Sequence, residues 1–271
     1  MPLIEVEQGR RIYYERRAGS GVPIVLVHGW AVDSRCWTPV VPALLRAGVP
    51  VITFDHRCCG RSDDDFDDVS VQALADDVVR LLDRCEIPRA ILNGWSLGGA
   101  VAVAAAAQLR ERSAGLVLTG AATPRYTRRD DFPYGGTAAD VQATIAAIDA
   151  DRAGAFANVA RAVFAAAPDA AQLEFVASMF LASSPRAYAT LLDLATLDQR
   201  ALLPALAAPA LLLHGADDRF VPVDIARFAA DSLPAATLSV YPNCGHAPFL
   251  EAPARYADEL VAFARNAQAG A

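Results

Sequence analysis

The sequence contains few charged residues, and its basic residues never gather into a run. Charged residues make up 20% of the 271 positions and hydrophobic residues 54%, which argues against a disordered chain. The formal net charge is 24 − 31 = −7, so a nucleic-acid partner is disfavoured on electrostatic grounds. The apolar run near residues 100–107 is too short to span a membrane, and the first residues show no secretory pattern. We therefore expect a cytoplasmic protein that does not bind a membrane.

Cysteine and histidine are also scarce. An odd count of five cysteines, with no secretory pattern before them, argues against a disulfide framework. The sequence has no Cys-x-x-Cys pair, and its four histidines lie far apart along the chain, so a structural zinc site is disfavoured. We expect no metal in this protein. The adjacent Cys58 and Cys59 are expected to be small buried thiols.

Short β-rich runs that end in small or polar residues alternate with helical patterns. Continuous apolar runs of this length are typical of parallel strands that are buried on both faces. The alternation predicts an α/β fold with a doubly wound, mostly parallel sheet, and partial alternation in residues 4–15 predicts an antiparallel hairpin at one edge. The predicted parallel strands cover residues 24–27, 49–54, 90–93, 115–119, 210–213 and 237–241.

The alternation stops between about residues 124 and 206. The β-rich runs disappear there, and Ala-rich helical segments separated by prolines and a Gly-Gly pair take their place. We expect residues 124–206 to form a helical insertion that covers one edge of a core built from residues 1–123 and 207–271. The alternative is a continuation of βαβ repeats.

The segment Gly94-Trp95-Ser96-Leu97-Gly98 lies between a predicted strand and a predicted helix. In a strained strand-to-helix turn a serine hydroxyl is held clear of the sheet, and small residues two positions before and after it avoid clashes. This context predicts that Ser96 is a nucleophile. The alternative is an ordinary tight turn in which Ser96 caps the helix.

A serine hydroxyl needs a base, and only four histidines can supply it. His28 and His214 precede glycines at strand ends, where they can anchor the backbone, and His56 lies in a turn where it can be solvated. His246 lies in the loop after the last predicted strand, and such loops are where a parallel sheet places its chemistry. We predict that His246 is the base.

The acid that orients this histidine should come from the loop after the preceding strand. That loop offers Asp218, which we predict to be the acid, and Asp217 as the alternative. The carboxylate that is not used can cap the following helix or pair with Arg219. The chain order Ser96, Asp218, His246 is the order that accompanies a Gly-x-Ser-x-Gly turn.

An acyl-transfer site also needs donors for a developing oxyanion. The backbone N–H of Leu97, directly after the serine, and that of Trp30, in the loop after the first parallel strand, are the candidates. The aromatic side chains of Trp30, Trp95 and Phe249 are candidates for the pocket lining, although core packing would explain them equally well.

Three segments together resemble the α/β-hydrolase superfamily, and most closely its pimeloyl-ester carboxylesterases. Similar segments occur in acyl-homoserine lactonases and in haloperoxidase-like esterases. The resemblance implies a helical lid, a Ser96–Asp218–His246 triad that works through an acyl-enzyme, and no metal or organic cofactor. It also implies that Trp30 and Leu97 are the oxyanion donors. The three segments are His28-Gly29-Trp30, Gly94-Trp95-Ser96-Leu97-Gly98-Gly99 and Gly245-His246-Ala247-Pro248-Phe249.

The resemblance predicts a serine carboxylesterase for small to medium acyl groups, with a small-molecule ester as substrate. A lactonase with the same triad and a non-catalytic ligand receptor on the same scaffold are the alternatives. The arginines of the insertion can form a basic face for an acidic substrate or simply be solvated. These are Arg125, Arg128, Arg129, Arg152 and Arg161.

Two features lie outside this pattern. Relatives often carry glycine where this chain has Cys58, so the backbone there must tolerate a side chain or turn differently. The acidic stretch at residues 63–68 is expected to be a solvated turn that places negative charge before a helix, rather than a calcium site.

Overall fold

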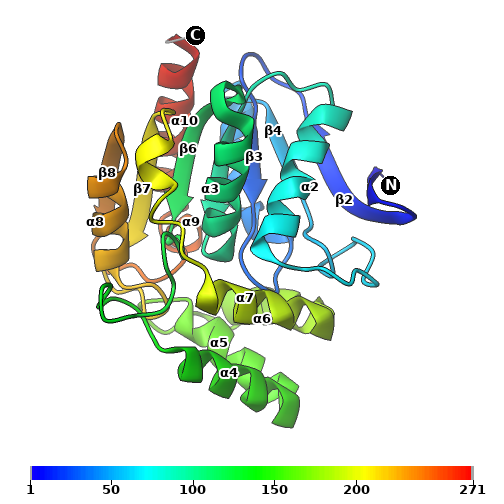
Figure 1. The fold of residues 1–271 in the computed structure, drawn as a ribbon, viewed down its shortest axis with the longest axis vertical. Helices are drawn as coiled ribbons and strands as arrows, with labels where there is room; N and C mark the ends of the chain where they lie inside the picture. The colour runs from blue at the N-terminus through cyan, green and yellow to red at the C-terminus, as the bar shows by residue number, and fades with distance from the viewer. Residues whose placement is uncertain (1, 270–271) are drawn as a thin grey trace.

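A computed structural model describes residues 2–269, which form one eight-stranded sheet with helices on both faces (Figure 1). The strand order is β1-β2-β4-β3-β5-β6-β7-β8. Strands β1 and β2 form the antiparallel hairpin at one edge, and β3 to β8 pair in parallel. The predicted fold class is therefore confirmed. The strands are β1 (Leu3–Glu7), β2 (Arg10–Arg17), β3 (Ile24–Val27), β4 (Val51–Phe54), β5 (Ala90–Trp95), β6 (Ser113–Thr119), β7 (Ala210–Gly215) and β8 (Ala236–Tyr241).

The central strands are buried on both faces, as their continuous apolar sequences predict. In β3, Val25 and Val27 pack into one hydrophobic cluster, and Ile24 and Leu26 pack into a second one on the opposite face. All four side chains are fully buried. Because side chains alternate across a strand, helices must cover both sides of such a sheet.

Helices α2, α3 and α8 supply the first cluster, and α1 and α10 supply the second. Figure 1 shows α2 and α3 side by side in front of the sheet and α10 behind it. The helices are α1 (Val41–Arg46), α2 (Val71–Arg84), α3 (Leu97–Leu109), α4 (Ala138–Ala150), α5 (Arg152–Ala162), α6 (Ala170–Ala182), α7 (Ala189–Thr196), α8 (Val223–Ser232), α9 (Pro248–Glu251) and α10 (Pro253–Ala269), with short 3-10 turns η1 (Ser34–Trp37), η2 (Arg110–Arg112), η3 (Pro185–Tyr188) and η4 (Leu203–Ala205). No helix within residues 2–269 is long and apolar enough to cross a membrane.

Between β6 and β7 the chain forms helices α4 to α7, which we call the inserted helices. They lie together beyond the end of the sheet toward which the arrows of β6 and β7 point (Figure 1). The connection between α6 and α7, which contains η3, is tied to the core by two hydrogen bonds. Trp30 Nε1 donates to the Ala187 carbonyl at 3.1 Å, and the Ser184 N–H donates to the Cys58 carbonyl at 3.0 Å.

Cys58 adopts a positive φ of 62°, a region that L-residues with a side chain rarely occupy. The turn therefore has a conformation that favours glycine and still accommodates the side chain of Cys58. Both Cys58 and Cys59 are buried, and burial raises the pKa of each thiol, to about 11 at Cys58. These properties fit the expected small buried thiols.

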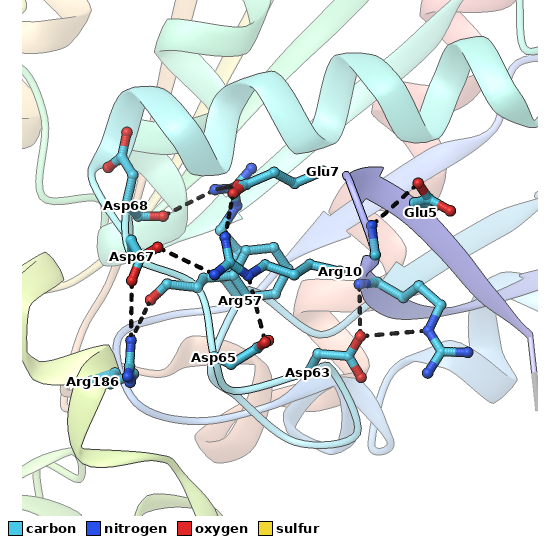
Figure 2. A network of polar contacts seen from close by, with 12 residues as sticks. Glu5, Glu7, Arg10, Arg57, Asp63, Asp65, Asp67, Asp68 and Arg186 are labelled. Atoms are coloured by element: carbon cyan, nitrogen blue, oxygen red, sulfur yellow. Dashed lines mark hydrogen bonds and ion pairs between the residues drawn. The ribbon is translucent and has the colours of Figure 1, made fainter.

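Arginines from three segments hold the acidic stretch 63–68 (Figure 2). Arg10 of the hairpin pairs with Asp67 at 3.1 Å. Arg186 of η3 donates to the Phe66 carbonyl at 3.2 Å and lies 3.5 Å from Asp67. Arg57, nearly fully buried, donates to the Asp68 carbonyl at 2.9 Å. The stretch is thus more than the solvated turn we expected, because it joins the hairpin to the inserted segment.

Candidate active site

Ser96 lies at the junction of β5 and α3 with φ 56° and ψ −120°. A backbone in this region is strained by about 1–3 kcal/mol, and the surroundings must hold it in place. Two backbone hydrogen bonds do so. The Ser96 N–H donates to the Thr119 carbonyl at 3.0 Å, and the Ala122 N–H donates to the Ser96 carbonyl at 2.9 Å. The side chain of Ser96 accepts no capping bond, so the alternative of an ordinary helix-capping serine is not what the turn shows.

Glycines let the turn pack tightly against its neighbours. A Cβ on Gly94 would lie 2.1 Å from the Gly98 carbonyl oxygen, and a Cβ on Gly98 would lie 2.3 Å from the Val27 carbonyl oxygen. Both distances are far below van der Waals contact, and the obstructing atoms are backbone. The small residues on each side of Ser96 are therefore required by the packing of β5, α3 and β3.

His246 is held in the loop between β8 and α9. Its Nδ1 lies 2.7 Å from Asp218 Oδ2, and its backbone N–H donates to the Val163 carbonyl at 2.8 Å. Trp95 Nε1 donates to the His246 carbonyl at 2.9 Å. Because an ionised carboxylate can only accept, the proton of a neutral His246 lies on Nδ1, which leaves Nε2 free to accept one.

Asp218 is fixed by the turn that follows β7. Its Oδ1 accepts the N–H groups of Phe220 and Val221, each at 2.9 Å, while its Oδ2 faces His246. Burial alone would raise the pKa of Asp218, but interactions with His246 first, then with His214 and the Val221 N–H, together hold that pKa below its usual value. Asp217 is exposed and makes no side-chain hydrogen bond within residues 2–269. Of the two carboxylates considered, the structure brings Asp218 to His246.

Gly120, at the end of β6, adjoins this pair with a positive φ of 47°. A Cβ there would lie 2.8 Å from the His246 carbonyl oxygen and 3.3 Å from Asp218 Oδ2. This steric role of Gly120 could not be predicted, because nothing in the sequence shows that β6 passes beside the loops after β7 and β8.

His28 and His56 lie next to each other, just after β3 and β4. The His56 N–H donates to His28 Nε2 at 2.8 Å, so the proton of His28 lies on Nδ1, which is 2.8 Å from the Gly29 carbonyl oxygen. His56 Nε2 lies 3.0 Å from the His28 carbonyl oxygen. His28 anchors backbone as predicted, but His56 is buried, and the expectation that it is solvated was wrong.

His214 anchors backbone on the other side of the site. Its Nε2 lies 2.8 Å from the Val221 carbonyl oxygen and 3.4 Å from Asp218 Oδ2. Burial lowers the pKa of His214, and it does the same for His28 and His56. All three are therefore neutral structural residues near pH 7, and none of them lines the cavity that contains Ser96.

The two predicted oxyanion donors have free N–H groups. Leu97 is the first residue of α3, where a helix leaves its N–H groups without intrahelical partners. The backbone N–H groups of Leu97 and Trp30 donate no hydrogen bond to any atom of residues 2–269. Both are available to an oxygen atom of a ligand.

Ser96 and His246 line a cavity of about 110 Å³ under the inserted helices. Trp30 and Trp95 line it too, as considered for the pocket, but Phe249 does not. Phe249 is fully buried between Trp37 and Trp95, at ring-centroid distances of 4.5 and 5.0 Å, so its assignment to the pocket was wrong and the packing alternative holds.

Most of the remaining wall comes from the insertion and was missed by the sequence analysis. Its sequence carries no catalytic motif, and the faces of its helices cannot be assigned to a cavity before their packing is known. These residues are Tyr126, Gly136, Thr137, Asp140, Val141, Thr144, Val159, Val163, Phe180, Leu191 and Leu194, to which the core adds Gly29 and Phe220. Within the described part of the chain, no cluster of three or more His, Cys, Asp or Glu residues could hold a metal ion.

Comparison with known proteins decides the family. The model of a family described as "Alpha/beta hydrolase family" matches residues 24–259 of this chain. The chain belongs to this family. As an α/β hydrolase it is 31% identical to an AB hydrolase superfamily protein of Bacillus subtilis over 236 residues, which cover 86% of this chain and 88% of that one.

Other similar α/β hydrolases carry more specific names. A pimeloyl-[acyl-carrier protein] methyl ester esterase of Nitrosomonas europaea is 33% identical over 246 residues, 88% of this chain and 94% of that one. The structure of an esterase from Exiguobacterium antarcticum superposes with a TM-score of 0.92 and 26% identity, covering 97% and 98% of the two chains. A structure described as an N-acyl homoserine lactone degrading enzyme superposes with a TM-score of 0.77 and 26% identity, covering 97% and 100%. The family and its esterase relatives predicted from three short motifs are thus confirmed.

Proposed function

We propose that this α/β hydrolase is a serine carboxylesterase that cleaves esters of small to medium acyl groups. The observation that carries the proposal is the 2.7 Å contact between Asp218 and His246 at the wall of the cavity that Ser96 also lines. The strained turn at Ser96 supports a role beyond structure, since its conformation has a free-energy cost and leaves the hydroxyl uncapped.

In the first half of the proposed reaction, His246 Nε2 takes the proton of the Ser96 hydroxyl while the Ser96 oxygen attacks the ester carbonyl carbon. The carbonyl oxygen becomes an oxyanion, which the N–H groups of Leu97 and Trp30 stabilise. The imidazolium of His246, stabilised by Asp218, then gives its proton to the departing alcohol oxygen. An acyl group remains on Ser96.

In the second half, a water molecule gives a proton to His246 Nε2 and attacks the acyl carbon. The second oxyanion uses the same two donors. Collapse of this intermediate breaks the bond to Ser96, whose oxygen regains the proton from His246, and releases a carboxylic acid. No cofactor takes part in this scheme.

Residues 124–206 would then act as a lid on the core formed by residues 1–123 and 207–271. Support comes from the cavity, most of whose wall the insertion supplies. A second link is the bond from the His246 N–H to the Val163 carbonyl, since it couples the end of α5 to the proposed base. Substrate choice would lie mainly in this insertion.

A lactonase is the second candidate, because the similarity to a lactone-degrading enzyme reaches 26% identity over nearly the whole chain. The same triad would open a cyclic ester, with the leaving alcohol still attached to the acyl group. Measuring kcat/KM on acyl-homoserine lactones beside p-nitrophenyl esters separates the two. A strong preference for the lactone ring would replace the esterase proposal.

The test of the nucleophile is Ser96→Ala, measured on a series of p-nitrophenyl esters of increasing acyl length. We expect kcat to fall by a factor of about 10³ or more, because the attacking oxygen is removed. Circular dichroism and the melting temperature should stay near those of the parent protein. Substantial turnover by the variant would disprove the assignment, and tight ligand binding without turnover by the parent protein would favour the receptor alternative.

A further inference from the structure

Among the described residues, the wall of the cavity contains one acidic side chain and no basic one besides His246. Around Ser96 and His246 the wall is largely apolar, with Phe180, Leu191 and Leu194 on the side of the inserted helices. The acidic side chain is that of Asp140. Within residues 2–269, no arginine lines this cavity.

Asp140 is held rigidly at the start of α4. Its Oδ2 accepts the backbone N–H and the hydroxyl of Thr137, each at 2.7 Å, while the Thr137 Oγ1 accepts the Asp140 N–H at 3.1 Å. These hydrogen bonds from Thr137 lower the pKa of Asp140, so the carboxyl is ionised at neutral pH. The negative charge therefore has a fixed place in the wall. Asp140 is solvent-exposed, which puts it at the open side of the cavity.

The basic residues nearest in sequence do not offset this charge inside the cavity. Arg128 contributes a weak attraction to Asp140, but it makes no ion pair with that carboxylate and does not line the wall. Arg125 is buried against Asp198 at 2.7 Å, and Arg152 donates to the Ser183 carbonyl at 2.5 Å. None of the five arginines considered for a basic face of the insertion lines the cavity.

Tyr126 adds a neutral polar group to the same wall. Its hydroxyl makes no hydrogen bond with any atom of residues 2–269. Burial, followed by the charges of Asp218 and Asp140, raises the pKa of Tyr126 to about 12, so the O–H stays protonated. It can donate to an uncharged oxygen of a ligand. A ligand carboxylate would find only neutral donors, such as this O–H and the N–H groups of Leu97 and Trp30, and would face Asp140 without a cationic partner. This is unfavourable because the charge loses solvation.

We propose that the cavity selects esters that carry no negative charge and that Asp140 is the residue that enforces this selection. The proposal rests on the proposed esterase function and specifies its substrate class. By this proposal, the chain would not be an enzyme for esters of acidic acyl groups, whatever the length of the acyl group.

The test compares two p-nitrophenyl esters of similar chain length: the neutral pentanoate and the anionic monoester of glutaric acid. We expect kcat/KM of the parent protein to be at least about tenfold lower for the anionic ester than for the neutral one at low salt. Asp140→Asn should raise the anionic-to-neutral ratio by about three- to fivefold, a range that fits a charge interaction exposed to solvent.

Asp149→Asn is the matched control. Asp149 lies on the same helix, is exposed and does not line the cavity, so its removal changes the net charge by the same amount. This control should leave the ratio unchanged. Raising the salt from about 0.05 to 0.5 M should shrink the effect of Asp140→Asn on this ratio, because salt screens interactions between solvent-exposed charges. An equal ratio for both variants, or no discrimination by the parent protein, would overturn the proposal.

Binding to Ser96→Ala separates this inference from the function on which it rests. Titration of that variant with dimethyl glutarate and with monomethyl glutarate compares a neutral ligand with an anionic one in the absence of turnover. We expect the neutral diester to bind at least about tenfold more tightly, and Asp140→Asn in the same background to narrow the difference. If Ser96→Ala still hydrolyses esters, the proposed nucleophile fails. Equal binding of the two ligands refutes the charge selection.

Discussion

Two pairs of histidines occupy the same edge of the sheet and differ in what their rings contact. Within residues 2–269, the rings of His28 and His56, after β3 and β4, hydrogen-bond only to backbone N–H and carbonyl groups. His214, near the end of β7, and His246, after β8, both lie near Asp218, but only His246 reaches the cavity. The residue type and its position at a strand end are therefore insufficient to identify a base. A carboxylate behind the ring and a cavity in front of it make the difference.

The largest loss of activity should distinguish His246 from His214. We expect His246→Ala to lower kcat/KM for a p-nitrophenyl ester by about 10⁴-fold or more, because no other group can take the proton of Ser96. His214→Gln, which can keep a donor for the Val221 carbonyl, should lower it by less than about tenfold. Equal losses in both variants would show that the distinction drawn from the cavity is wrong.

The carboxylate behind the ring gives the next largest effect. Asp218→Asn should lower kcat by about 10³- to 10⁴-fold, because an amide cannot stabilise the imidazolium and favours the wrong tautomer of His246. Asp217→Asn, one position earlier and exposed, is the matched control and should change kcat by less than about twofold. A loss confined to the Asp217 variant would reverse our choice of acid.

The first pair should affect catalysis only through the backbone. His56 holds the His28 carbonyl, and His28 holds the Gly29 carbonyl, which belongs to the same peptide as the Trp30 N–H. We expect His56→Phe to lower kcat by about tenfold with little change in KM, because a displaced oxyanion donor weakens only the transition state. His56→Gln can restore a donor to the His28 carbonyl and should recover most of the activity. An increase in KM without loss of kcat would contradict this positioning role.

The sequence was sufficient for the parts of the site that local rules determine. The placement of Ser96 in a strand-to-helix turn was predictable because strand, turn and helix are consecutive there. The placement of Asp218 and His246 was predictable because each follows a strand of the same sheet, and the catalytic roles of all three stay predictions. His56 was misjudged, because its burial results from the packing of β3 beside β4, which are separated in sequence by more than twenty residues. Phe249 was misplaced for a similar reason, since the ring reaches Trp37 in the core.

The insertion was predictable in outline but not in its chemistry. Alanine-rich helices without a strand pattern indicated a helical segment, and α4 to α7 are that segment. In the sequence, Asp140 is an ordinary residue at the start of a helix, and in the structure it does form a capping box with Thr137. Its place in the cavity wall depends on the angle at which α4 meets the core, and no local pattern encodes that angle.

The smallest effect concerns stability and tests whether the first pair is neutral in the folded protein. Burial lowers the pKa of His28 and His56 below the value of about 6.5 expected for the unfolded chain. Between the folded and unfolded pKa values the unfolded chain binds more protons, so this stability is present above about pH 6.5 and is lost as the pH falls. Each such histidine contributes up to about 1.4 kcal/mol per pH unit.

Urea titrations between pH 7 and pH 5 measure this slope. His214 changes the free energy of unfolding with pH in the same direction, since burial lowers its pKa too. Asp218, with its lowered pKa, loses its contribution to stability only below about pH 4. We therefore expect the free energy of unfolding to fall toward pH 5 in the parent protein, and to fall less steeply in His56→Phe by about one histidine's share. An unchanged slope in that variant would mean that His56 is not held neutral by burial, and the contrast between the two pairs would then rest on hydrogen bonding alone.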